Sequence, residues 1–157
     1  MTSGYRLRAA TTADLPVMAD HRRRMLIDMG TADDEKMAAM LVRFVPWAKQ
    51  RMECGECFTW FALSESGGDV AAGAAVWMKP LLPGTASERE TLPYVFNVFC
   101  EPGHRRRGLA RMLMAEIVAW AKAEGQEIMD LHASDEGRPL YTSMGFEATR
   151  EMRLDLS

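Results

Sequence analysis

The chain has 157 residues, of which 48% are hydrophobic and 26% charged, and this is enough to bury the core of a single domain spanning residues 1–157. Its 19 Lys and Arg residues against 22 Asp and Glu residues give a net charge of -3, which argues against a general affinity for nucleic acid or an anionic membrane. No signal peptide begins the chain, no apolar run approaches the roughly 18–20 residues that span a bilayer, and the cysteines suggest no disulfide framework, so we expect a cytoplasmic protein.

The first third of the chain predicts a strand followed by two helices. Residues 5–8 alternate apolar and charged side chains in the manner of a short strand. Thr11-x-x-Asp14 resembles a capping box, so a first helix is expected to begin there and to end at Gly30. A second helix is expected to start near Asp33, and Pro46 is expected to kink or divide it.

The middle of the chain predicts a hairpin and then an irregular segment. Residues 57–63 and 70–78 are apolar runs separated by a turn rich in Ser and Gly, which is typical of two antiparallel strands. Residues 79–93 contain three prolines and predict no regular element, so this segment either borders a site or is mobile.

The last third predicts a strand over residues 94–100, a helix from about 107 to 124 and a strand over 128–133. Crossovers of this kind join parallel strands. A short helix over residues 139–144 and one or two strands within 146–156 complete the chain. The expected fold is an α/β domain whose mixed, mostly antiparallel sheet contains one parallel pair and is flanked by about four helices.

One stretch, Arg105-Arg106-Arg107-Gly108-Leu109-Ala110, links the strand at residues 94–100 to the following helix. A strand that turns through a glycine into a helix presents unpaired backbone N–H groups at the positive end of the helix dipole. Gly108 lacks a Cβ, and Ala110 is the smallest substitute at the next inward position, so the backbone can approach a ligand closely. The stretch therefore predicts an anion site, most simply for a pyrophosphate.

Two motifs in this part of the chain resemble those of a known family. Arg105-x-x-Gly108-x-Ala110 fits the Q/R-x-x-G-x-G/A signature of the GCN5-related N-acetyltransferases (GNATs), and residues 140–146 fit their L-Y-x-x-x-G-F. The resemblance implies that acetyl-CoA places its pyrophosphate on the N–H groups of residues 106–111. It also implies that the pantetheine arm pairs with the strand at 94–100, where that strand splays from its parallel neighbour. The residues implied in cofactor binding are Val98, Phe99, Cys100, Arg105, Arg106, Arg107, Gly108, Leu109, Ala110, Arg111 and Ser134.

The same resemblance implies transfer of the acetyl group to a primary amine by direct attack in a ternary complex, without a metal. Tyr141 would donate a proton to the departing thiolate, or it is a core residue beside Phe146. Residues 130–135 resemble the E-V-R-x-S-N segment of ribosomal-protein N-terminal acetyltransferases. Asp130 or His132 would therefore deprotonate the amine, although an ion pair or a hydrogen-bonded structural histidine is the alternative for each. Asn97 would orient acceptor or water, or it marks a bulge.

Two other patterns are given structural interpretations. Cys54-x-x-Cys57 has neither a second cysteine pair nor a nearby histidine pair, so it is read as two partly buried thiols rather than a zinc or redox site. His21-Arg22-Arg23-Arg24 is read as a solvated helix face, with a carboxylate-bearing acceptor near these arginines as the alternative.

The sequence contains no motif that identifies the acceptor. A small amine, an amino acid, a peptide N-terminus and a lysine all stay open. A non-catalytic acyl-CoA-binding module on the same scaffold is the alternative to an enzyme. A nucleic-acid-binding domain that uses the arginine clusters is a third class, which the net charge disfavours. A homodimer is a possible assembly because members of the family often form dimers.

Overall fold

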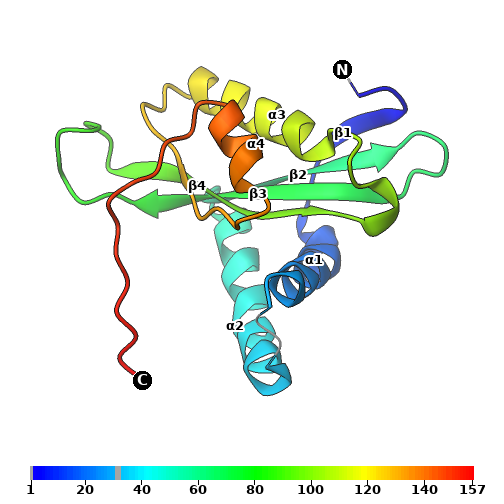
Figure 1. Cartoon of the computed structure of the whole chain (residues 1–157), viewed down its shortest axis with the longest axis horizontal. Coiled ribbons are helices and arrows are strands. Elements are labelled where there is room, and N and C mark those ends of the chain that lie inside the picture. Colours follow the sequence, from blue (N-terminus) through cyan, green and yellow to red (C-terminus); the bar gives the residue numbers. More distant parts are fainter. Residues whose placement is uncertain (1, 31–32) are drawn as a thin grey trace.

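The computed structural model describes residues 2–30 and 33–157. Within them, five strands form one sheet in the order β1-β2-β3-β4-β5 (Figure 1). The strands are β1 (Tyr5–Ala9), β2 (Cys57–Ser64), β3 (Val70–Pro80), β4 (Thr91–Cys100) and β5 (Asp130–Leu131). The first four pair antiparallel, and β4 pairs parallel with β5. The predicted mostly antiparallel sheet with one parallel pair is confirmed.

Helices cover both faces of this sheet (Figure 1). In the figure, α1 (Leu15–Asp28) and α2 (Asp34–Glu53) lie below the sheet, while α3 (Leu109–Ala123) and α4 (Arg138–Ser143) lie above it. Short 3-10 turns, Thr12–Asp14 and Pro102–His104, precede α1 and follow β4. Of the helices that the structure describes, none is long and apolar enough to cross a bilayer. The cytoplasmic location expected from the sequence stays a prediction.

The side-chain alternation of the strands divides the core into two clusters. Phe61 and Leu63 of β2 pack with Leu15 and Phe44 on the α1/α2 face, whereas Ala62 between them packs on the α3 face. Successive side chains of a strand point to opposite faces, so one apolar strand supplies both clusters. The small side chain of Ala62 and a run of alanines in β3 leave room for α3, whose Leu109, Leu113, Met114 and Ile117 are buried there.

Both predicted helices of the first third form, with one correction. The capping box at Thr11 and Asp14 is present, and it opens a 3-10 turn that leads into α1. The expected division at Pro46 was wrong, because α2 is one helix from Asp34 to Glu53, and the alternative of a kink there stays a prediction. Proline removes one backbone donor. Phe44 and Ala48, buried on either side of it, hold the helix against the sheet.

Several strand boundaries also differ from the prediction. The irregular segment shrinks to residues 81–90, because the β3–β4 ladder continues to the pair Pro80 and Thr91. Prolines at strand ends cost few ladder bonds, so they do not end the pairing earlier. β5 is limited to Asp130–Leu131, and no strand forms in the described residues 146–157. The prediction of one or two strands in this last segment was therefore wrong, because the segment pairs with no strand of the sheet.

Candidate functional site

The parallel pair separates soon after it forms, and this leaves one edge of β4 open. The register of β5 with β4 consists of Tyr94 opposite Asp130 and Val95 opposite Leu131. β4 itself continues to Cys100 and stays paired with β3 on its other side. Within the described chain, the backbone from Phe96 to Cys100 therefore has no strand on its β5 side. Buried backbone groups need partners, so this edge is suited to an extended ligand.

A bulge at Asn97 shapes the same part of β4. The β3–β4 register shifts between Gly73 and Ala75, and Asn97 has a φ of 56°. The shift directs Phe96 and Asn97 to the α1/α2 face: Phe96 contacts rings of α2, and the Asn97 amide donates to the Met18 carbonyl at 2.9 Å. Asn97 is 5% exposed. Of the two roles expected for Asn97, the bulge is confirmed. The Asn97 side chain also connects β4 to α1.

The loop after β4 presents free backbone donors at the start of α3. Arg106 and Gly108 have φ values of 61° and 78°, and Gly108 is the N-cap of α3. The helical hydrogen bonds begin with Met112 N–H donating to the Gly108 carbonyl at 3.0 Å. Among the residues that the structure describes, the N–H groups of residues 106–111 have no acceptor. Successive free N–H groups at the positive end of a helix form an anion site.

The arginine side chains of this loop mostly make contacts within the protein. Arg105 donates through Nε to the Cys100 carbonyl at 3.1 Å and pairs with Asp28 at 2.8 Å. Arg107 donates to the Tyr5 hydroxyl at 3.1 Å, and Arg111 donates to the Ser143 hydroxyl at 2.6 Å. Arg106 is exposed and has no partner in the described chain. These side chains hold the loop in place, so the backbone is left to bind an anion.

The first residue after β4, Glu101, ties this loop to α1. Its carboxylate accepts two hydrogen bonds of 2.8 Å from Arg24 and lies 3.3 Å from Nε2 of His21. Burial raises the pKa of Glu101, but Arg24 and His21 outweigh it and bring the pKa below its usual value. Burial lowers the pKa of His21 despite the neighbouring Glu101. With His21 2% exposed, the interpretation of residues 21–24 as a solvated face was wrong there.

Tyr141 and Ser134 lie on the α3 side of the open edge. Tyr141 is 9% exposed, its ring contacts Phe146 with centroids 5.9 Å apart, and burial raises the pKa of its phenol. In the described structure its hydroxyl makes no hydrogen bond. The Ser134 hydroxyl accepts from the Gly137 N–H at 3.1 Å, in the turn before α4. A Cβ on Gly137 would lie 3.0 Å from the Tyr141 ring, so the glycine leaves room for this ring. The sequence analysis did not identify Gly137 as a residue that positions Tyr141.

The two candidate bases are placed differently. Asp130 is partly buried in β5, opposite Tyr94, and forms no ion pair within the described residues. Its charge contributes, after burial and Glu151, to a raised pKa of the Tyr94 phenol. His132 is exposed and follows the end of β5, so the expectation that both residues share a strand face was wrong. The strand ends because β4 and β5 have already separated.

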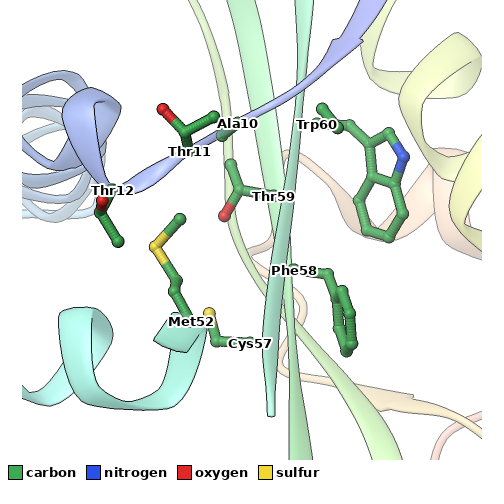
Figure 2. A pocket seen from close by; sticks show the side chains of 9 residues that line it. Ala10, Thr11, Thr12, Met52, Cys57, Phe58, Thr59 and Trp60 are labelled. Atoms are coloured by element: carbon green, nitrogen blue, oxygen red, sulfur yellow. The ribbon is translucent and has the colours of Figure 1, made fainter. Parts of the chain in front are cut away.

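A pocket of about 210 Å³ lies elsewhere, where β1 ends beside β2 and the end of α2 (Figure 2). Ala10, Thr12, Met52, Cys57 and Thr59 are among its lining residues, and none of the candidate site residues is. Figure 2 shows Thr59 between the other side chains, and its buried hydroxyl has no hydrogen-bond partner among the described residues. This pocket is not part of the site at β4.

The two cysteines of the Cys54-x-x-Cys57 pattern lie in different environments. Cys54 is exposed, Cys57 is buried, and all three cysteines of the chain are free. Burial raises the pKa of Cys57 to about 12, which keeps its thiol protonated and unreactive. No cluster of His, Cys, Asp and Glu side chains that could hold a metal occurs among the described residues.

The open strand edge, the free N–H groups and the two motifs agree with the comparison to known families. The model of the Acetyltransferase (GNAT) family matches residues 17–146. The chain therefore belongs to the GNAT acetyltransferase family, whose members transfer acetyl groups. None of the curated proteins matches it.

Solved structures give the same fold. A GCN5-related N-acetyltransferase from Ralstonia eutropha is 30% identical with a TM-score of 0.91, covering 98% of this chain and 99% of the other. An acetyltransferase from Clostridium acetobutylicum, solved with acetyl-CoA, is 25% identical with a TM-score of 0.86, covering 97% and 96%. Aminoglycoside acetyltransferase AAC(6')-Iy, in complex with a bisubstrate analogue, is 17% identical with a TM-score of 0.67 and shares the fold over 99% of both chains.

Proposed function

We propose that this protein transfers the acetyl group of acetyl-CoA to a primary amine by direct attack in a ternary complex. The observation that carries the proposal is the continuity of a strand edge that no neighbouring strand covers with a run of free backbone N–H groups. The open edge of β4 over residues 96–100 leads through one short loop to the free N–H groups of residues 106–111. An extended arm attached to a pyrophosphate matches this order, and the Clostridium acetobutylicum relative was solved with acetyl-CoA.

In this proposal, backbone groups of Val98, Phe99 and Cys100 pair with the pantetheine arm. Residues 105–111 hold the pyrophosphate, and Ser134 contributes from the turn before α4. Burial raises the pKa of the Cys100 thiol, so it stays protonated at neutral pH. This favours direct attack by the amine over an acetyl-cysteine intermediate.

The amine nitrogen forms a bond to the thioester carbon, the carbon–sulfur bond breaks, and the thiolate leaves with a proton from Tyr141. The proton that the nitrogen loses as it becomes an amide restores the phenol. An alkyl ammonium has a pKa of about 10.4, so a base must first remove its proton. Asp130 fits this role because it is partly buried beside the open edge and forms no ion pair in the described chain. His132 is the second candidate. Asn97, whose amide donates to the Met18 carbonyl, holds the bulge of β4 against α1.

The test combines calorimetric titration with acetyl-CoA and release of the CoA thiol across a panel of amines. We expect binding together with amine-dependent thiol release. Thermal stabilisation by CoA without thiol release from any amine would favour a non-catalytic acyl-CoA-binding module. Absence of acetyl-CoA binding would refute both functions.

We also propose a homodimer in which the C-terminal segment of each copy pairs with the sheet of the other. Met152, Leu154 and Leu156 alternate along the segment and are 94%, 79% and 89% exposed. In Figure 1 the segment runs down past the sheet without joining it as a strand. Alternating apolar side chains fit a strand with one buried face. β5 is the last strand of the sheet and pairs with β4 alone in the described chain, so its outer edge is the one available to this segment.

Light scattering of the whole chain should give the mass of a dimer, and Leu154→Lys with Leu156→Lys should give a monomer. Glu147→Lys, a charge change in the same segment outside the apolar alternation, serves as the control. A monomeric wild-type protein, or a dimer unaffected by the double substitution, would contradict this arrangement.

A further inference from the structure

An aromatic wall lies on the α1/α2 face of the sheet, beside the open edge of β4. Phe44 and Trp47 of α2 contact Phe96 of β4, with ring centroids 6.4 and 5.8 Å apart. Trp47 also contacts Trp77 of β3, at 5.4 Å. Phe96 is the first residue of β4 beyond its pairing with β5. The wall therefore borders the position at which an acceptor would approach the thioester.

Arg22 of α1 lies against this wall without a negatively charged partner. Its guanidinium carbon is 5.2 Å from the ring centroid of Phe44 and 5.9 Å from that of Phe96. One nitrogen donates to Oδ1 of Asn97 at 3.3 Å. Within residues 2–30 and 33–157, no carboxylate lies within ion-pair distance of Arg22. A guanidinium has five N–H donors, so most of its hydrogen-bonding capacity remains available.

The neighbouring arginines of α1, in contrast to Arg22, do form ion pairs with carboxylates. Arg23 pairs with Asp20 at 2.9 Å, and Arg24 pairs with Glu101 at 2.8 Å. Burial lowers the pKa of Arg22, whereas the hydrogen bond to Glu101 raises the pKa of Arg24. A partly desolvated cation without an anion is unfavourable, and an anionic ligand removes that cost.

Other cations along the wall also lack carboxylate partners in the described structure. The guanidinium carbon of Arg51 lies 4.5 Å from the Trp47 ring centroid, and its Nε is buried without a partner. Lys79 lies 5.1 Å from the Tyr94 ring centroid. Arg153 adds a further cation near Tyr94, and the carboxylates of Asp130 and Glu151 act on the same phenol, so cations outnumber carboxylates on this surface. This balance favours an acceptor that carries negative charge and disfavours a polycationic one.

We propose that the acceptor amine carries a carboxylate, which binds the Arg22 guanidinium while the amine faces the open edge of β4. The inference rests on the proposed acetyl transfer. A carboxylate matches the planar guanidinium through paired hydrogen bonds, and the apolar part of the acceptor packs on Phe44 and Phe96. The acceptor class is thus an amino acid or another amino-carboxylate, in contrast to the acetylneamine portion of the AAC(6')-Iy analogue.

The test measures kcat/KM by CoA-thiol release for matched pairs of acceptors: L-amino acids and their amides, with neamine as a polycationic probe. Wild type should prefer the carboxylates by roughly 10- to 100-fold, as expected for hydrogen bonds between charged groups. Arg22→Gln should raise KM for the carboxylates by a similar factor, with little change for the amides. Arg22→Lys should recover part of the preference. Arg23→Gln, which removes a surface charge one residue away, should leave it unchanged.

Acidic peptides and free amino acids separate two sources of the carboxylate, and reaction of either supports the inference. A second readout is calorimetric titration of amino acids into the complex of the protein with CoA, and Arg22→Gln should weaken this binding by the same factor. Amides or neamine reacting as well as the carboxylates would overturn the inference while acetyl transfer stands. Thiol release absent across the whole panel would overturn the proposed enzyme and this inference with it.

Discussion

Substitution of Gly108 by valine is the sharpest test of the proposed cofactor site. Gly108 has a φ of 78°, and a Cβ there would meet no atom outside its chain neighbours closer than 3.6 Å. The glycine is therefore required by its backbone conformation, and no tight packing within the protein requires it. A β-branched residue at positive φ costs about 1–3 kcal/mol, and the loop relieves this strain by moving.

The expected loss of binding follows from the free N–H groups of residues 106–111. Hydrogen bonds to a charged group contribute about 1.5–3 kcal/mol each, so a shift that breaks two of them costs about 3–6 kcal/mol. Calorimetric titration should then show CoA binding weakened by roughly 10²- to 10⁴-fold. Arg106→Ala removes an exposed side chain without a protein partner and should weaken binding by about fivefold or less.

Gly125→Val is the matched control, because Gly125 has a φ of 70° at the other end of α3. It should lower the thermal stability in the same way as Gly108→Val and leave CoA affinity unchanged. If Arg106→Ala weakens binding more than Gly108→Val, the site depends on arginine side chains, and the reasoning from the backbone is refuted.

Three further predictions concern catalysis and stability. Tyr141→Phe should lower kcat roughly 10²-fold with little change in KM for acetyl-CoA, and unchanged turnover would remove its role as an acid. Asp130→Asn should lower kcat more than His132→Gln, because only Asp130 lies in β5 beside β4; the reverse order would identify His132 as the base. Burial lowers the pKa of folded His21, so below its unfolded pKa of about 6.5 the unfolded state binds the proton more readily and stability falls. Urea unfolding of His21→Gln should show a smaller loss between about pH 7 and 5, and an equal loss would exclude His21 as its source.

The strands and helices that the sequence predicted well are those whose pattern is local. The two strands of the first hairpin and both helices of the first third form close to their expected positions. The last segment failed because alternation at Met152, Leu154 and Leu156 specifies a strand but not the neighbour with which it pairs. The residue at which β5 ends could not be predicted from the sequence either, because it depends on where β4 and β5 separate.

The sequence by itself determined the family and the loop around Gly108 to which we assign the pyrophosphate, because this signature acts through backbone conformation within a few residues. Only the tertiary structure decided what surrounds the acceptor position. The contact of Arg22 with Asn97 joins residues 75 positions apart, and that of His21 with Glu101 joins residues 80 apart. Such contacts depend on how α1 packs on a bulged strand, and no local pattern encodes that packing.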